Sequence, residues 1–260
     1  MSKSLILTAG IGYSYRDLER FMKSYFKQCA DSCDLIVITD CNIEKRATFK
    51  DHGVEIFPYS SAQVIPTVIN NSRYFAYMDV LLCVEGQYEN VFLCDSRDLI
   101  FQGNIFDAIH DEGLHFFLED KTIQQEYWNS MWIERFYGVK ALREIQSKPI
   151  VCSGTTYGSF RSIVRYVSLM VNEMPRQKFV NFGQFAYSAY DQGIHNYLIH
   201  NNMIDLEVHM HNNHKIVSTL GFTDKKHIKL LENGMFEVQE TVPVVLHQYD
   251  RHMEIFGDHI

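Results

Sequence analysis

The chain of 260 residues has no apolar stretch long enough to cross a membrane. A spanning helix needs about 20 predominantly apolar residues, and no run here approaches that length. The N-terminal segment holds only a short apolar run, whereas a secretory signal peptide needs a longer apolar core and a small-residue cleavage site. We therefore expect a cytoplasmic protein with no transmembrane segment, while peripheral contact with a membrane stays open.

Positive charge is scarce in this sequence. It contains 24 Lys and Arg residues against 32 Asp and Glu residues, which gives a formal net charge of −8. Non-specific binding to nucleic acid needs a dense face of Lys and Arg, so we expect no nucleic-acid partner. An anionic substrate would have to be met by a few local cations or by a metal ion.

Paired cysteines and flexible linkers are also missing. None of the six cysteines lies in a Cys-x-x-Cys motif, and several fall in apolar runs. We expect all six to be reduced core thiols, as is usual in a reducing compartment. No internal repeat, low-complexity segment or Pro- or Gly-rich linker divides the chain, so residues 1–260 are predicted to form one domain.

The sequence does contain an alternation of apolar runs and helical patterns. Apolar runs predict buried strands at residues 5–8, 35–39, 54–57, 90–94, 114–118 and 149–152. Helical spacing occurs at residues 16–30, 44–52, 68–84, 127–137, 160–174 and 191–200. This order is typical of an α/β domain of Rossmann type, with a mostly parallel central sheet flanked by helices. Short alternating runs beyond residue 204 predict a small antiparallel C-terminal part.

Two aspartates, Asp95 and Asp98, come directly after the predicted strand at residues 90–94. In open α/β folds ligands bind at the carboxyl ends of the strands. A pair of carboxylates there can hold Mg²⁺ or Mn²⁺, which in turn binds a diphosphate. The two side chains converge only if the chain turns at Ser96 and Arg97, because residues i and i+3 of a straight strand point to opposite faces. The alternative is a helix cap with a surface ion pair of Arg97.

Together with the strand-loop-strand opening and a late histidine, His247, these aspartates resemble the metal motif of GT-A-type nucleotide-sugar glycosyltransferases, with features of family 8. In this chain the motif is Asp-Ser-Arg-Asp in place of Asp-x-Asp. The resemblance implies a GT-A-like domain with a nucleotide-binding half over about residues 1–100 and a donor-sugar and acceptor half over about 101–260. It also implies that Asp95, Asp98 and His247 hold Mn²⁺ or Mg²⁺.

The resemblance extends to the donor sugar. Asp191-Gln192 is similar to the Asp-Gln pair that contacts the sugar in family 8, so both are candidate catalytic residues, and Glu119 after the fifth predicted strand is a further candidate. The implied reaction moves a sugar from a nucleoside-diphosphate sugar, a UDP-sugar being favoured, to a glycan or other hydroxyl acceptor. The implied nucleotide and donor contacts are Thr8, Ala9, Gly10, Tyr13, Arg73, Asp95, Ser96, Arg97, Ser153, Gly154 and Thr155.

Three local expectations accompany this interpretation. Asp191 is expected to cap the helix at residues 191–200. Asp250 is expected to orient the imidazole of His247. Arg73 is expected to reach the donor phosphates as a charge-assisted donor, with an ion pair to Asp79 as the alternative.

Other interpretations stay open. A non-catalytic sugar- or nucleotide-binding module fits the same sequence, and a sugar nucleotidyltransferase would want a Gly-rich basic loop where residues 9–16 offer only Arg16. Strand histidines are a competing zinc candidate, although no Cys or carboxylate nearby completes their set: His209, His211 and His214. A group of aromatic residues belongs to the core or, if exposed, forms a sugar-stacking acceptor platform: Tyr127, Trp128, Trp132, Phe136 and Tyr137.

Overall fold

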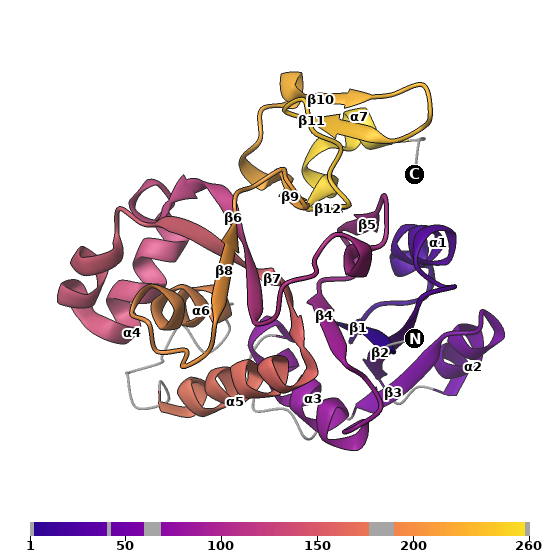
Figure 1. Cartoon of the computed structure of the whole chain (residues 1–260), viewed down its shortest axis with the longest axis horizontal. Coiled ribbons are helices and arrows are strands. Elements are labelled where there is room, and N and C mark those ends of the chain that lie inside the picture. Colours follow the sequence, from indigo (N-terminus) through magenta and orange to yellow (C-terminus); the bar gives the residue numbers. More distant parts are fainter. Residues whose placement is uncertain (1–2, 41–42, 60–68, 177–189, 258–260) are drawn as a thin grey trace.

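The computed structural model describes residues 3–40, 43–59, 69–176 and 190–257. Its largest feature is a seven-stranded sheet with the order β3-β2-β1-β4-β7-β6-β8 (Figure 1). The first four strands in this order run parallel, β7 is antiparallel to both of its neighbours, and β8 is parallel to β6. The strands are β1 (Ser4–Ala9), β2 (Cys33–Asp40), β3 (Glu55–Tyr59), β4 (Asn90–Cys94), β6 (Leu114–Thr122), β7 (Pro149–Ser159) and β8 (Val208–His211). The expected α/β architecture with a mostly parallel central sheet is therefore confirmed.

Helices cover both faces of this sheet because side chains alternate along its strands. In β1, Leu5 and Leu7 enter one core together with α3, α5 and α6, whereas Ile6 enters a second core with α1 and α2. α4 packs against α6 over a smaller apolar cluster. The helices are α1 (Glu19–Gln28), α2 (Ile43–Asp51), α3 (Ile69–Cys83), α4 (Tyr127–Ile145), α5 (Phe160–Arg176), α6 (Asp191–His200) and α7 (Met253–Phe256).

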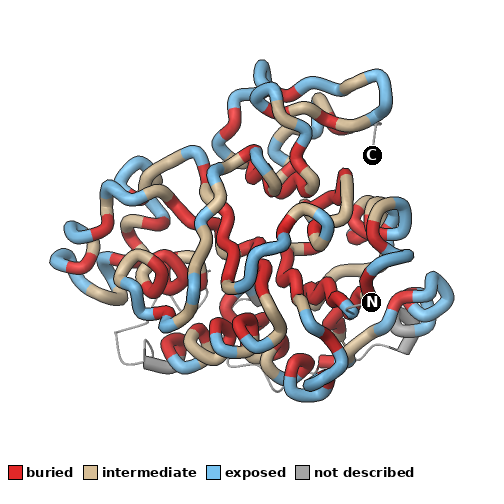
Figure 2. The backbone as a smooth tube through the Cα atoms, viewed as in Figure 1, coloured by how far each residue is buried: buried red, intermediate tan, exposed pale blue. Residues whose placement is uncertain are grey.

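Residues 217–257, here named the C-terminal unit, form a separate small layer at one end of the molecule (Figure 1). β12 (Val245–His247) pairs in parallel with β9 (Val217–Thr219) and antiparallel with β5 (Leu99–Phe101), which comes from the main body. β10 (Ile228–Leu230) and β11 (Phe236–Val238) form an antiparallel pair. Buried residues concentrate in the strands, while exposed residues follow the loops and outer helix faces (Figure 2). The expected small antiparallel part is present, and β5 joins it to the central sheet.

Several predicted boundaries were wrong for physical reasons. β7 continues through Ser153, Gly154 and Thr155 to Ser159, because this segment pairs with β4 on one side and β6 on the other. Pro58 lies inside β3 and does not end it, which is tolerated because β3 is an edge strand. The helix begun at Tyr127 runs on to Ile145 across a break at Gly138 (φ 86°), a backbone conformation that favours glycine.

The cysteines and the membrane expectation can be compared with the structure. Cys29, Cys33, Cys94 and Cys152 are buried free thiols. Cys83 is free but exposed, so its expected place in the core was wrong; it is the last residue of α3 and lies on the outer face of the helix, while Leu81 and Val84 are buried. Cys41 lies outside the described residues. No helix in the described ranges is both long and apolar enough to span a bilayer.

Candidate active site

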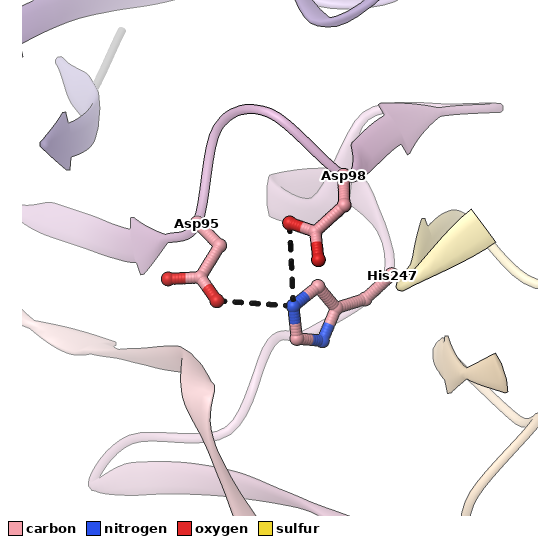
Figure 3. Close-up of side chains that lie close together, drawn as sticks. All are labelled: Asp95, Asp98 and His247. Carbon is pink, nitrogen blue, oxygen red and sulfur yellow. Dashed lines mark hydrogen bonds and ion pairs between the residues drawn. The ribbon is translucent and has the colours of Figure 1, made fainter. Parts of the chain in front are cut away.

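Asp95, Asp98 and His247 converge at the carboxyl end of β4 (Figure 3). Asp95 follows β4, the chain turns at Ser96 and Arg97, and Asp98 precedes β5. β12 pairs antiparallel with β5 so that His247 lies opposite Leu99. The His247 Nε2 atom is 3.1 Å from Asp95 Oδ2 and 3.9 Å from Asp98 Oδ1. Among the described residues, no other set of three such side chains brings its ligand atoms within 4.8 Å of one another.

Gly154 makes room for this cluster. It lies in β7 beside Asp95, whose backbone N–H donates to the Gly154 carbonyl at 2.8 Å. A Cβ atom at Gly154 would sit 2.5 Å from Asp95 Oδ2 and 2.6 Å from His247 Cε1. Because real side chains do not approach so closely, any larger residue would displace the Asp95 and His247 side chains. The middle position of Ser153-Gly154-Thr155 therefore has a steric requirement for glycine at the cluster.

The charges of the cluster are strongly coupled. Burial would raise the pKa of Asp95, but Arg73 and His247 outweigh it and lower the pKa to about 2. Burial raises the pKa of Asp98, although His247 opposes the shift. Burial disfavours a charged His247, yet Cys152 and the aspartates hold its pKa well above the usual range. The two neighbouring aspartates therefore favour the protonated form of the imidazole.

The far side of the His247 ring is held by Cys152 and Thr219, not by Asp250. Nδ1 of His247 lies 3.4 Å from Cys152 Sγ and 3.5 Å from Thr219 Oγ1. The Asp250 carboxylate instead forms an ion pair with Arg97, at 2.8 Å. The expectation that Asp250 orients the imidazole was therefore wrong, because Gln248 adopts a left-handed turn (φ 58°) that carries the following residues away from the ring.

Arg73 bridges Asp95 and Asp191 from the opposite side. Its guanidinium forms ion pairs with Asp95 and, at 2.7 Å, with Asp191 Oδ2, and it donates to the Ser153 carbonyl at 3.1 Å. Burial would lower the pKa of Arg73, but the two carboxylates outweigh it and raise that pKa further. Arg73 is only 6% exposed and Asp191 only 3%. The alternative pairing of Arg73 with Asp79 is not the one observed.

Asp191 is the first residue of α6 and does not cap it. The N-cap position is Tyr190, which makes no side-chain cap, while the Asp191 carboxylate also accepts from the Ser153 hydroxyl at 3.0 Å. Asn71 does the capping in its place, because its Oδ1 accepts from the backbone N–H groups of Tyr190 and Asp191 at 2.9 and 3.1 Å. The predicted N-cap role of Asp191 was therefore wrong: its side chain is drawn to Arg73.

Gln192 and Glu119 continue this network. The Gln192 Oε1 accepts from the Ser153 N–H at 3.1 Å, and its Nε2 donates to Glu119 Oε1 at 3.2 Å and lies 3.3 Å from Asn129 Oδ1. Burial raises the pKa of Glu119 to about 7. Glu119 and Asp120 lie inside β6, not after the strand as predicted, and the Asp120 carboxylate accepts from His214 and Thr223 instead. The candidate catalytic residues thus share one hydrogen-bond network with Arg73.

A polar cavity of about 250 Å³ opens beside the cluster. Seven residues expected at the site line it: Ala9, Tyr13, Arg73, Asp95, Ser96, Arg97 and Asp98. Thr8 is buried behind the cavity and donates to the Cys94 carbonyl at 2.8 Å, and Gly10 is tied to the Ile38 carbonyl. Thr155 is buried, and its hydroxyl has no hydrogen-bond partner in the described part of the chain. Asp191, Gln192 and Glu119 lie behind Arg73 and do not line the cavity.

Three lining residues were missed from the sequence: Asn70, Gln248 and Arg251. Gln248 and Arg251 follow His247 closely, and the Gln248 N–H donates to the Asp98 carbonyl at 2.7 Å. Their nearness to His247 was the available signal. Asn70 lies on α3 three residues before Arg73, so it shares the helix face of Arg73 and could have been inferred from that spacing.

The competing histidine and aromatic groups take different places. His209 and His211 stack on His115 of β6, with ring centroids 4.6 and 5.2 Å apart, and His214 pairs with Asp120, so the three histidines do not share one metal position. Tyr127 and Trp128 at the start of α4 are 70% and 52% exposed. The rest of the aromatic group is partly buried against the cores: Trp132, Phe136 and Tyr137.

No known family model matches this chain, and no curated protein is similar enough to it to count as a match.

Proposed function

We propose that this protein is a metal-dependent glycosyltransferase of the GT-A type that uses a nucleoside-diphosphate sugar, with a UDP-sugar favoured, and transfers the sugar to a glycan or other hydroxyl acceptor. The observation that carries the proposal is the convergence of Asp95, Asp98 and His247 beside a polar cavity at the carboxyl edge of the sheet. Ligands of open α/β folds bind at this edge. The Asp191-Gln192 network behind Arg73 supports a donor-sugar role for the same edge.

The three side chains suit a divalent cation such as Mn²⁺ or Mg²⁺. Two carboxylate oxygens and one imidazole nitrogen form a hard-to-borderline donor set. Bonds to such a cation are about 2.1 Å long, so ligand atoms around one ion lie roughly 3–4 Å apart, close to the 3.1 and 3.9 Å observed from His247 Nε2. When bound, the cation would neutralise the charge that develops on the leaving diphosphate.

The cavity supplies further groups for a nucleoside diphosphate. Arg97 and Arg251 place two cations at its wall, which suits the diphosphate, and the Tyr13 ring suits stacking on the base. The Asp250 carboxylate, which binds Arg97, holds that side chain beside the cavity. An anionic ligand can therefore bind although the chain as a whole is acidic, because these two arginines line the cavity itself.

Arg73 and its partners would orient the donor sugar. Arg73 already balances the Asp191 carboxylate, so Asp191 is suited to holding Arg73 and Ser153 in place and to electrostatic stabilisation, more than to attack as a free nucleophile. Gln192 is partly exposed, in contrast to Asp191 and Glu119, and is therefore the member of the network best placed for direct contact with a sugar hydroxyl. Glu119 holds the Gln192 amide in position.

The start of α4 supports a carbohydrate acceptor. Tyr127 and Trp128 are exposed, and the next residue, Asn129, contacts the Gln192 amide. Aromatic faces stack well on the apolar faces of sugars. An acceptor glycan lying over these rings would thus approach the network that holds the donor sugar.

Thermal-shift measurements test the proposal. We expect UDP, and more weakly other nucleoside diphosphates, to raise the melting temperature with Mn²⁺ and to lose most of this effect in excess chelator, because ligands of the native state stabilise it. A UDP-sugar with Mn²⁺ should also be hydrolysed slowly to UDP. Equal shifts with and without the metal, or no shift with any nucleoside diphosphate, would refute the proposal.

A further inference from the structure

A second cavity, of about 150 Å³, lies between α1 and the C-terminal unit, away from the candidate active site. One wall is α1, the floor is β5, and the other wall is the turn and strand at Gly234, Met235 and Phe236. We name it the α1 groove. It shares no lining residue with the cavity beside Asp95.

The helix wall of the α1 groove is cationic. Arg20, Lys23 and Lys27 line it at positions i, i+3 and i+7, which places them on one face of the helix. The rise of an α-helix spaces the first and last of them about 10 Å apart along the axis. No carboxylate is among the residues that line the groove. In a chain with a formal net charge of −8, three cations grouped without a lining acid stand out.

These cations are only weakly neutralised within the described part of the chain. Arg20 donates to the Gly257 carbonyl and to the Met253 sulfur, neither of which carries charge. Lys23 pairs with Glu19 on the same helix, but both side chains are largely exposed, so the pair is worth little. Lys27 has no ion pair among the described residues. By contrast, the lysines at 225, 226 and 229 in the C-terminal unit are each paired with a carboxylate.

Both walls of the groove are fixed to β5 by hydrogen bonds. The Ser24 hydroxyl of α1 accepts from the Phe101 N–H at 3.0 Å and donates to the Phe21 carbonyl at 2.8 Å. On the other side, the Gln102 amide donates to the Phe236 and Pro243 carbonyls and accepts from the Phe236 N–H. The groove is therefore pre-formed, and little ordering free energy would be lost when a ligand enters.

The geometry points to a second ligand site in the α1 groove, for a molecule that carries two or more phosphate groups. A single small anion would contact one or two of the three cations, whereas a chain of phosphates matches their spacing along the helix. The phosphates could belong to a soluble polyphosphate compound or to a lipid headgroup at a membrane surface. The site is independent of the proposed glycosyl transfer, since it uses none of the residues around Asp95.

The test is titration calorimetry with inorganic tripolyphosphate in excess chelator, so that no metal can bring the phosphate to Asp95. We expect saturable binding that weakens as salt is raised, because salt screens charge–charge attraction, and an affinity at least about tenfold lower in the double variant Lys23→Gln/Lys27→Gln, because two charge-assisted contacts to phosphate are lost. The matched control is Lys225→Gln/Lys226→Gln, which makes the same change of net charge on similarly exposed lysines and should alter the affinity less than twofold. Asp98→Ala should bind as the wild type does.

Four further outcomes decide the source of the phosphates and the fate of the inference. Co-sedimentation of the wild type, but not of Lys23→Gln/Lys27→Gln, with phosphatidylcholine vesicles that carry phosphatidylinositol bisphosphate would assign the site to a lipid headgroup. Binding of tripolyphosphate without co-sedimentation would assign it to a soluble ligand. Equal loss of affinity in both double variants, or no saturable binding at millimolar tripolyphosphate, would overturn the inference and leave the proposed glycosyl transfer untouched.

Discussion

Asp95 belongs to two clusters of charge that differ in the origin of their positive charge. In the first cluster Arg73 is held between Asp95 and Asp191, so a built-in guanidinium neutralises both carboxylates. In the second cluster Asp95 and Asp98 face His247, and the imidazole is the one base between them. The first cluster is complete with this chain's own side chains, whereas the second holds its charge only while the imidazole carries a proton.

The Arg73 cluster is therefore a pre-organised part of the protein, whereas the cluster around His247 suits the binding of an added cation. Arginine keeps its charge at every pH at which the protein folds, so the Arg73 cluster is permanent. The His247 imidazole, unlike a guanidinium, can lose its proton, and neutral imidazole is a common metal ligand. A divalent cation can therefore replace the proton in the second cluster, whereas in the first it would have to displace a buried guanidinium. The following variants test whether the two clusters differ in this way.

The largest expected effect is that of Asp98→Ala. This change removes one of the three proposed metal ligands from the second cluster but leaves the Arg73 cluster intact, so Mn²⁺-dependent stabilisation by UDP should disappear. Thermal shift with and without chelator measures this. Asp205→Ala, at an exposed aspartate far from the cavity in sequence, is the control and should keep the full metal-dependent shift. Full activity of Asp98→Ala, or of the wild type in excess chelator, would contradict the assignment of the metal ligands.

Asp191→Asn should have the next largest effect, on both stability and turnover. Arg73 would lose one of its two carboxylates while almost fully buried, and breaking such a pair costs about 3 kcal/mol. If the network orients the donor sugar, turnover should also fall about 100-fold, equivalent to about 2.7 kcal/mol of barrier. Urea denaturation and steady-state kinetics on the folded fraction measure the two effects.

Ser153→Ala is the companion variant, since it removes a hydroxyl that donates to Asp191, with longer contacts to Gln192 and Arg73, but no charge, and it should cost about 1 kcal/mol. Loss of stability in Asp191→Asn with unchanged turnover per folded molecule would make the Arg73 cluster purely structural. The catalytic assignment would then pass to Glu119.

The sequence predicted the sheet well because its strands are continuous apolar runs. Residues 35–39 and 90–94 lie inside β2 and β4, and the turn expected at Ser96 and Arg97 is present. The pattern failed for β7, whose second half reads Ser-Gly-Thr-Thr and is polar and small. Its strand conformation is set by pairing with β4 and β6, which a local pattern does not contain.

The site was predictable where the residues adjoin a strand end and unpredictable where partners are distant in sequence. Asp95 and Asp98 adjoin strands and His247 is the last residue of one, which marked all three as candidates. Arg73 was expected at the phosphates, yet it meets a carboxylate 118 positions away. Cys152 at the His247 ring was likewise hidden, because a cysteine in an apolar run gives no signal beyond burial.

The pH dependence of stability should differ in sign between two buried groups near the Arg73 cluster, His195 and Glu119. Burial lowers the pKa of His195 to about 3, below its ordinary 6.5. The unfolded chain then binds a proton that the folded chain refuses, so this group makes stability rise by up to about 1.4 kcal/mol per pH unit between pH 3 and 6.5. The pKa of Glu119 is raised to about 7, so the folded chain keeps a proton that the unfolded chain loses. This group therefore makes stability fall as the pH rises between about 4.5 and 7.

Paired variants resolve these opposing slopes. We expect His195→Phe to lose stability less steeply on acidification than the wild type does between pH 6.5 and 4.5, and Glu119→Gln to lose it more steeply. The measurement is the urea midpoint at each pH, with the exposed His110→Asn as the control. If the urea midpoints of all four proteins changed with pH in parallel, His195 and Glu119 would have ordinary pKa values. The surroundings of the Arg73 cluster would then be accessible to water.

The smallest expected effect lies at the outer end of the same network, at Trp128. If a sugar stacked on Trp128 gains as much as a pair of aromatic side chains does, about 0.5–1.5 kcal/mol, Trp128→Ala should raise the KM for a glycan acceptor about 2- to 12-fold and leave kcat and donor binding unchanged. Phe26→Ala removes a comparably exposed ring from α1 and should change nothing. Both tryptophans of the chain, Trp128 and Trp132, lie in α4, so quenching of intrinsic fluorescence reports on this helix and its immediate contacts. The KM could be unchanged in Trp128→Ala and the wild-type fluorescence could fail to respond to the acceptor. Both results together would show that the acceptor does not bind at α4, and that the Arg73 cluster serves only the donor sugar.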